Sequence, residues 1–121
     1  MKWIAAGLLA SLMNVLADDA KTIGATQAEK FFQETVVVTG KVAQVSIREK
    51  LVYLNLDEKY PASPLTCVIF AKSTNQFGDL KALEGKPVEV RGRIEAYKDK
   101  PQIVLTSSNQ LHVVETARKP D

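Results

Sequence analysis

The chain has 121 residues and a formal net charge of +2, which suits one domain with a modest core. A charge so close to zero excludes a strongly basic nucleic-acid-binding protein, so any such ligand would depend on local clusters of cations. Cys67 is the only cysteine, which excludes an internal disulfide. It lies in an apolar run, and we expect it to be buried.

Residues 1–17 have the features of a secretory signal peptide. Lys2 gives a short positive region, an apolar stretch runs from Trp3 to Leu16, and Ala17 is a small residue at the expected cleavage site. The stretch is shorter than the roughly 20 apolar residues that span a bilayer, so cleavage is favoured over retention as a membrane anchor. We therefore expect a periplasmic or secreted protein without a transmembrane anchor after cleavage.

The next segment, residues 18–34, is expected to be a polar leader followed by a short helix. Thr26 and Glu29 have the spacing of a capping box, in which each side chain bonds the other residue's backbone N–H. An apolar stripe at helical spacing predicts that this helix packs on the domain through Ala28, Phe31 and Phe32.

Three strands are expected at the start of the main domain, which covers residues 35–114. Residues 35–47 are rich in β-branched side chains, and a slip in the alternation after Val42 predicts a bulge. Residues 51–57 alternate cleanly, with Val52, Leu54 and Leu56 on one face and Tyr53, Asn55 and Asp57 on the other. Residues 65–71 are apolar on both faces, which leaves the inward face of the third strand open.

A short helix and two further strands complete the expected domain. Residues 73–85 predict a helix that packs through Phe77, Leu80 and Leu83. Residues 86–97 and 101–106 have strand patterns, while residues 110–114 either extend the last strand or add a short sixth. The remaining residues, 115–121, are expected to be a flexible tail.

This order of elements is typical of an OB-fold, a mainly β, five-stranded Greek-key barrel with a helix between strands three and four. Here an N-terminal helix precedes the barrel, and the helix after strand three would close one end of it. Gly40 and Gly92 lie near the middle of the first and fourth strands, which suits strands that must bend.

Four segments resemble small exported bacterial OB-fold proteins: "VTGKVAQV", "YLNLDEKYPASPLTCVIF", "GKPVEVRGRIEAYKDKPQIVL" and the later "QLHVV". Those proteins are related to the tRNA-anticodon-binding-like OB-fold group. The resemblance covers roughly Thr22 to Val114. It implies the OB-fold and, through the wider group, nucleic-acid binding, and it supplies no catalytic residue.

The usual ligand surface of an OB-fold is the face of strands two and three together with the loops joining strands one to two and four to five. Cations that follow phosphates, placed beside aromatic rings that stack bases, favour single-stranded nucleic acid or another anionic oligomer. The two loops and the two strands supply both kinds of side chain. The predicted ligand-binding residues are Arg48, Lys50, Tyr53, Asn55, Phe70, Tyr97, Lys98 and Lys100.

Other interpretations of these polar residues remain open. Charged turns are common for solvation alone, and Glu49 and Asp99 share the same two turns. The row of Tyr53, Asn55 and Asp57 would suit a sugar, or it is the polar side of a half-buried strand. Cross-strand ion pairing is favoured for Arg91 and Arg93, which Glu89 and Glu95 flank. Tyr60 is interpreted as a loop anchor packed on the barrel rim.

Catalysis has little support in the sequence. His112 is the only histidine, and its place in an apolar segment favours a structural role. The spacing of histidine, cysteine and acidic residues indicates no metal site, and there is no glycine-rich phosphate loop. We expect a non-enzymatic binding module without cofactor or metal. The alternatives are a cell-envelope protein-interaction module and a stress module that binds a small ligand or cation.

Overall fold

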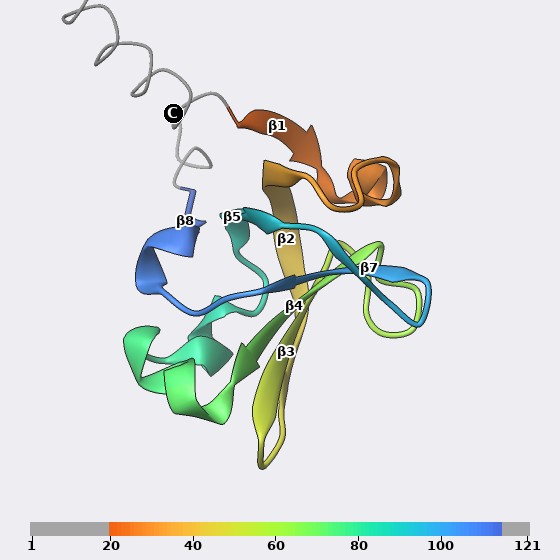
Figure 1. Ribbon diagram of the computed structural model, residues 1–121. Helices are drawn as coiled ribbons and strands as arrows, with labels where there is room; N and C mark the ends of the chain where they lie inside the picture. The colour runs from red at the N-terminus through yellow and green to blue at the C-terminus, as the bar shows by residue number, and fades with distance from the viewer. Residues whose placement is uncertain (1–19, 115–121) are drawn as a thin grey trace, which may run out of the picture.

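The computed structural model describes residues 20–114 (Figure 1). The expected signal peptide and tail lie outside these residues. Within them no helix is long and apolar enough to cross a membrane. The elements in chain order are β1 (Lys21–Gly24), η1 (Ala25–Lys30), β2 (Thr35–Ile47), β3 (Leu51–Leu56), β4 (Leu65–Phe70), η2 (Ala71–Gln76), η3 (Leu80–Leu83), β5 (Pro87–Arg93), β6 (Glu95–Tyr97), β7 (Lys100–Val104), η4 (Ser108–Gln110) and β8 (Leu111–Val113), where η marks a 3₁₀ helix.

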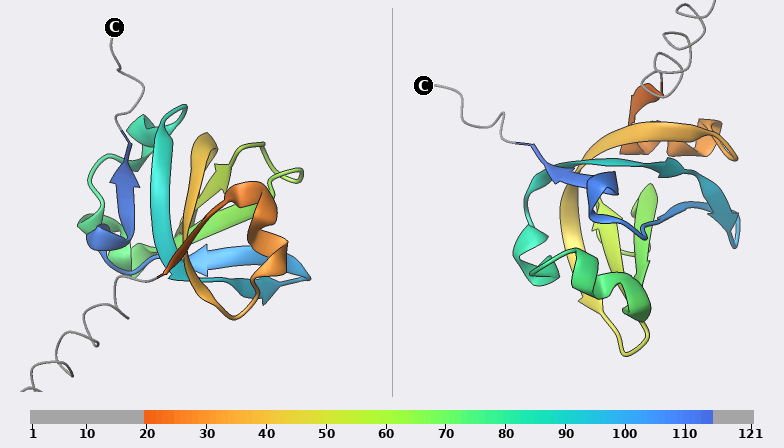
Figure 2. Two further views of the ribbon diagram at one scale, coloured as in Figure 1. Left: turned by 90° about the horizontal axis from the view of Figure 1, so that it is seen from above. Right: turned by 60° about the vertical axis from the view of Figure 1, so that its left-hand side comes forward.

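The long strand β2 organises the barrel because it belongs to two parts of the wall. Its first half pairs antiparallel with β5, and its second half pairs antiparallel with β3. The wall continues through β4, antiparallel to β3, to β7, which is parallel to β4. The wall ends at β6, which pairs with β7 and directly follows β5 in the chain, so the sheet curls back towards β5. Figure 2 shows the resulting barrel, with η2 and η3 gathered at one end.

The mainly β, OB-fold class is confirmed, but the expected count of five strands is wrong: the described residues form eight strands. β1 lies where a polar leader was expected; it pairs in parallel with β2, and its Ile23 is buried. The predicted fourth strand breaks at Ile94 into β5 and β6. The short sixth strand, left open by the sequence, is present as β8 and pairs with β5.

The helices also differ from expectation in length and position. The first begins at Ala25, and Gln27 Oε1 accepts a hydrogen bond of 2.9 Å from the Gly24 N–H, so the predicted capping box of Thr26 and Glu29 is wrong. The helix expected over residues 73–85 is two shorter turns, η2 and η3. Its packing role is confirmed, because Leu80 is buried and Phe77 and Leu83 pack against the core.

The predicted bulge is present where the register between β2 and β3 shifts, between Val42 and Gln44. Both Val42 and Val45 are buried, so the extra residue lets the strand return to the same core face while it bends. Gly92 lets β5 bend for a different reason, which is a close approach to a side chain. A Cβ atom on this residue would lie 2.6 Å from Ile103 Cγ2, so only glycine lets β5 approach that side chain.

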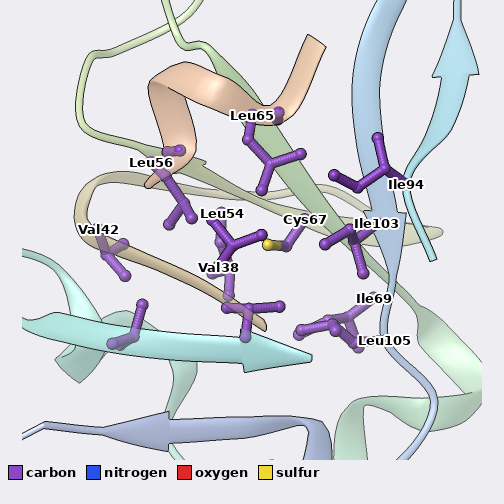
Figure 3. Packing of buried hydrophobic residues seen from close by; sticks show 14 of the residues in the cluster. Val38, Val42, Leu54, Leu56, Leu65, Cys67, Ile69, Ile94, Ile103 and Leu105 are labelled. Atoms are coloured by element: carbon purple, nitrogen blue, oxygen red, sulfur yellow. The ribbon is translucent and has the colours of Figure 1, made fainter. Parts of the chain in front are cut away.

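The core fills the inside of the barrel (Figure 3). Cys67 is completely buried within it, as expected, and burial raises the pKa of its thiol to about 12. A thiol with that pKa stays protonated at neutral pH and is therefore a packing group. With its inner face filled by apolar side chains, the barrel can meet ligands only on its outside.

Candidate functional site

A groove of about 660 Å³ lies over the outer face of β3 and β4. The β2–β3 turn, the loop of residues 57–64 and the β6–β7 hairpin contribute its walls; the last two lie side by side in Figure 1. Its volume falls within the range of small-ligand sites. Seven of the eight predicted ligand residues line it: Arg48, Lys50, Tyr53, Asn55, Tyr97, Lys98 and Lys100.

The groove carries positive charge only. Arg48 and Lys50 line it from one end, and Lys98 and Lys100 line it from the other. No aspartate or glutamate is among its lining residues. Glu49 and Asp99 share the two turns but do not line the groove. A concave surface with charges of one sign attracts counter-ions, so this site favours an anionic ligand.

The β6–β7 hairpin is tight and holds its lysines in place. Lys98 and Asp99 have φ angles of 53° and 68°, as in the type I′ turn that closes two-residue hairpins. Lys98 Nζ lies 5.4 Å from the centroid of the Tyr97 ring, within range of a cation–π contact. Lys100 Nζ donates a 2.8 Å hydrogen bond to the Pro61 carbonyl, which joins the hairpin to the 57–64 loop.

All three tyrosines of the chain line the groove. Tyr60 is 72% exposed and Tyr97 is 55% exposed, so both rings present large open faces. The interpretation of Tyr60 as an anchor packed on the rim is therefore wrong. Phe70 shares the outer face, since it pairs with Leu51 across the strands, but it does not line the groove. The aromatic surface of the groove is thus made of tyrosine.

The floor of the groove is a connected hydrogen-bond network around Asn55, which lies on the outward face as predicted but is only 3% exposed. Its Nδ2 donates to Gln44 Oε1 at 2.8 Å, and its Oδ1 accepts from Thr66 Oγ1 at 2.7 Å. Ser63 Oγ also lies 3.3 Å from Asn55 Oδ1. Both ends of the amide are occupied, so Asn55 joins β2, β3, β4 and the 57–64 loop.

Several polar and aromatic residues of the groove lining were not among the predicted ligand residues, namely Gln44, Tyr60, Ser63, Thr66 and Gln102. Thr66 and Gln102 pair with each other across β4 and β7 and would follow from alternation once the inward face of β4 was fixed. Gln44 follows the bulge, which obscures its face. Asp57 instead leaves the predicted polar row, because its Oδ1 accepts from the Lys41 N–H at 3.1 Å.

The remaining candidates lie away from the groove. Arg93 pairs with Glu95 at 3.1 Å along the chain, so the favoured cross-strand pairing is wrong for this residue. His112 is exposed on β8, opposite Glu89, and is not a core residue. Residues 20–114 contain no group of three histidine, cysteine or acidic side chains that could hold a metal ion.

A curled β wall with a groove over β3 and β4 is typical of an OB-fold protein, the class to which the geometry assigns this chain. Residues 14–109 match the family of OB-fold nucleic acid binding domains, and the chain belongs to that family. No curated protein matches the chain.

Solved structures show the same fold in distant proteins. Asparaginyl-tRNA synthetase of Entamoeba histolytica, in complex with asparaginyl-adenylate, matches with a TM-score of 0.56 and 18% identity over 78% of this chain. A putative aspartyl-tRNA synthetase from Leishmania major matches with a TM-score of 0.52 and 10% identity over 78% of this chain. The S. pombe Stn1–Ten1 complex matches with a TM-score of 0.50 and 17% identity over 66% of this chain. The match covers 24%, 21% and 57% of those three chains, respectively.

Proposed function

We propose that this chain is a non-enzymatic binding module for single-stranded nucleic acid or another anionic oligomer. The observation that carries the proposal is one groove lined by four cations and three tyrosines and by no carboxylate. Membership of the nucleic-acid-binding OB-fold family supports the same ligand class.

The two kinds of side chain suit the two parts of a nucleotide. The cations at either end of the groove match a phosphate backbone that passes from the β2–β3 turn to the β6–β7 hairpin. The open faces of Tyr60 and Tyr97 suit bases that have left their stack, and each stacked base contributes about 1–3 kcal/mol. A duplex keeps its base faces covered, so the tyrosines favour a single strand.

The second part of the proposal is export. Residues 1–17 have the features of a secretory signal, so we infer that the protein meets its ligand in the periplasm or outside the cell. The test is to express the full chain in a bacterium, fractionate the cells and sequence the N-terminus of the product. An N-terminus at Asp18 in the periplasm or medium is expected, whereas an intact chain confined to the cytoplasm would refute export.

Binding is tested by fluorescence anisotropy with labelled single-stranded oligonucleotides of about 12 nucleotides, within the range that OB-folds cover. Affinity should fall as salt rises, with a slope of about −0.7 per phosphate contact in a plot of log K against log salt. Replacing both Lys50 and Lys98 by glutamine should weaken binding about tenfold and make this slope shallower.

A matched control removes the same charge elsewhere. Lys30 and Lys86 are exposed and do not line the groove, so replacing both by glutamine should change affinity by less than about threefold, because salt screens distant charges. Absence of binding at low salt would reject the proposal. An equal loss in both double variants would reject the groove as the site.

A further inference from the structure

Gln44 occupies an unusual place, because a bulge directs it to the floor of the groove. The register between β2 and β3 shifts just before this residue, and Gln44 then pairs with Asn55. Bulges commonly redirect one side chain beside a functional site. Gln44 lines the groove together with Tyr60 and Thr66.

The orientation of the Gln44 amide is fixed by a backbone group. The N–H of Tyr60 lies 3.0 Å from Gln44 and can only donate, so the atom that faces it must be the oxygen Oε1. The same oxygen accepts from Asn55 Nδ2. Turning the Gln44 amide over would set donors against donors at both contacts, and this one backbone N–H therefore orients both amides.

This arrangement leaves the Gln44 nitrogen for a ligand. None of the hydrogen bonds among residues 20–114 uses Gln44 Nε2. The hydroxyl of Thr66 already donates to Asn55 Oδ1, so it can offer a ligand only an acceptor. The floor of the groove thus presents Gln44 Nε2 as a donor in a fixed orientation, because Gln44 Oε1 already accepts two hydrogen bonds.

We propose that Gln44 is a specificity-determining residue that donates a hydrogen bond to the carbonyl oxygen at ring position 4 of a pyrimidine base, so that the groove prefers uracil to cytosine. The inference rests on the proposed function and adds a base preference to it. Uracil has a carbonyl oxygen at ring position 4, where cytosine has an amino group. An amino group facing Gln44 Nε2 would set two donors against each other, and the Gln44 amide cannot turn over to relieve the clash.

The test compares oligo(dU) with oligo(dC) of equal length by anisotropy. These oligomers share backbone, charge and ring size. Their bases differ at ring positions 3 and 4, where uracil has an N–H and a carbonyl and cytosine has a bare nitrogen and an amino group. The natural protein should bind oligo(dU) about tenfold more tightly, the effect expected of one well-placed hydrogen bond against an unmatched donor. Gln44→Glu keeps an oxygen for the Tyr60 and Asn55 donors but replaces the free donor by an acceptor. The preference should then vanish or reverse.

Gln102→Glu is the matched control because it adds the same charge to the lining of the same groove. It should weaken binding of both oligomers equally and keep their ratio. Circular dichroism and thermal unfolding establish that both variants fold. Equal affinity of the natural protein for the two oligomers, or the same change of ratio in both variants, would overturn the inference while leaving the proposed function intact. Binding to neither oligomer would overturn both.

Discussion

The outer face of β5 carries acidic and basic side chains together, whereas the groove over β3 and β4 gathers cations without carboxylates. On β5, Glu89 and Arg91 are exposed, and Arg93 is held 3.1 Å from Glu95. Paired surface charges of this kind cancel at short range and contribute little to stability. The β5 face is therefore a solvated wall of the barrel.

In the groove, charge is separated from its counter-charge. The net charge of +2 averages over both faces and conceals the difference. Glu49 and Asp99 share the two turns but do not line the groove, so the charged side chains that a ligand contacts there are the four cations. The comparison teaches that local sorting of charge, and not its total, distinguishes a binding surface from a solvated one.

The largest expected effect is a loss of stability, without a loss of binding, on substitution in β5. Gly92→Ala should lower the free energy of unfolding by about 2 kcal/mol, since the new Cβ would lie 2.6 Å from Ile103 Cγ2 within a filled core. Urea unfolding measures the loss. Oligonucleotide affinity of the folded variant should be unchanged, because Gly92 does not line the groove.

A double-mutant cycle with Ile103→Ala identifies the cause. The alanine removes the Cγ2 atom, so adding Gly92→Ala to this background should cost less than about 0.5 kcal/mol. A full cost in both backgrounds would show that the steric explanation is wrong.

The second effect is the converse, a loss of binding without a loss of stability. Tyr60→Ala should weaken oligonucleotide binding about tenfold through the loss of one stacking surface. Tyr60 is 72% exposed, and its bond to Gln44 comes from the backbone, so the free energy of unfolding should change by less than about 0.5 kcal/mol. Anisotropy and urea unfolding measure the two quantities.

Phe70→Ala is the matched aromatic control. Phe70 was predicted as a ligand residue, is 41% exposed and lies outside the groove lining. Its replacement should leave affinity unchanged. If both variants lose the same affinity, the ligand surface extends along β4 beyond the groove.

The sequence predicts the wall of the barrel well because strand patterns are local. The β-branched run gives β2 with its observed bounds and its bulge, and alternation gives both faces of β3. It misses the break at Ile94, whose backbone binds Gln33 and Glu34, residues far away in the chain. It also misses β1, which is too short to show a pattern and forms by pairing with β2.

Only part of the site is predicted, because local patterns locate the loops but not the tertiary contacts of their side chains. Knowledge of OB-fold loops was enough to gather the four cations. Which residues are free to bind depends on tertiary packing. Gln44 on β2 occupies the nitrogen end of the Asn55 amide, and Ser63 of the 57–64 loop shares its oxygen end; the same loop places Tyr60 in the groove lining. The donor on Gln44 depends on a bulge, a loop and one backbone N–H meeting at one point.

The smallest expected effect concerns β2, the strand that both faces share. Just beyond Gln44, the Val45 N–H donates to Glu84 Oε2 at 2.8 Å, and Lys81 Nζ lies 3.2 Å from the same oxygen. The backbone hydrogen bond from Val45 and then the contact with Lys81 hold the pKa of Glu84 below its ordinary value. A carboxylate of lowered pKa stabilises the fold above the pKa of the unfolded chain, about 4.3 for glutamate, and loses this contribution as pH falls through the folded value.

Glu84→Gln should therefore lower the Tm slightly at pH 7, and the gap between natural protein and variant should close as pH falls from about 4.3 towards the lower folded pKa. Thermal unfolding between pH 7 and pH 3 measures this gap. Glu89→Gln, on the exposed face of β5, supplies the control and should show a smaller gap at pH 7. If the difference in Tm between the natural protein and Glu84→Gln stayed constant down to pH 3, the carboxylate charge would not be what holds η3 to β2. The contact between these two elements would then depend on packing alone.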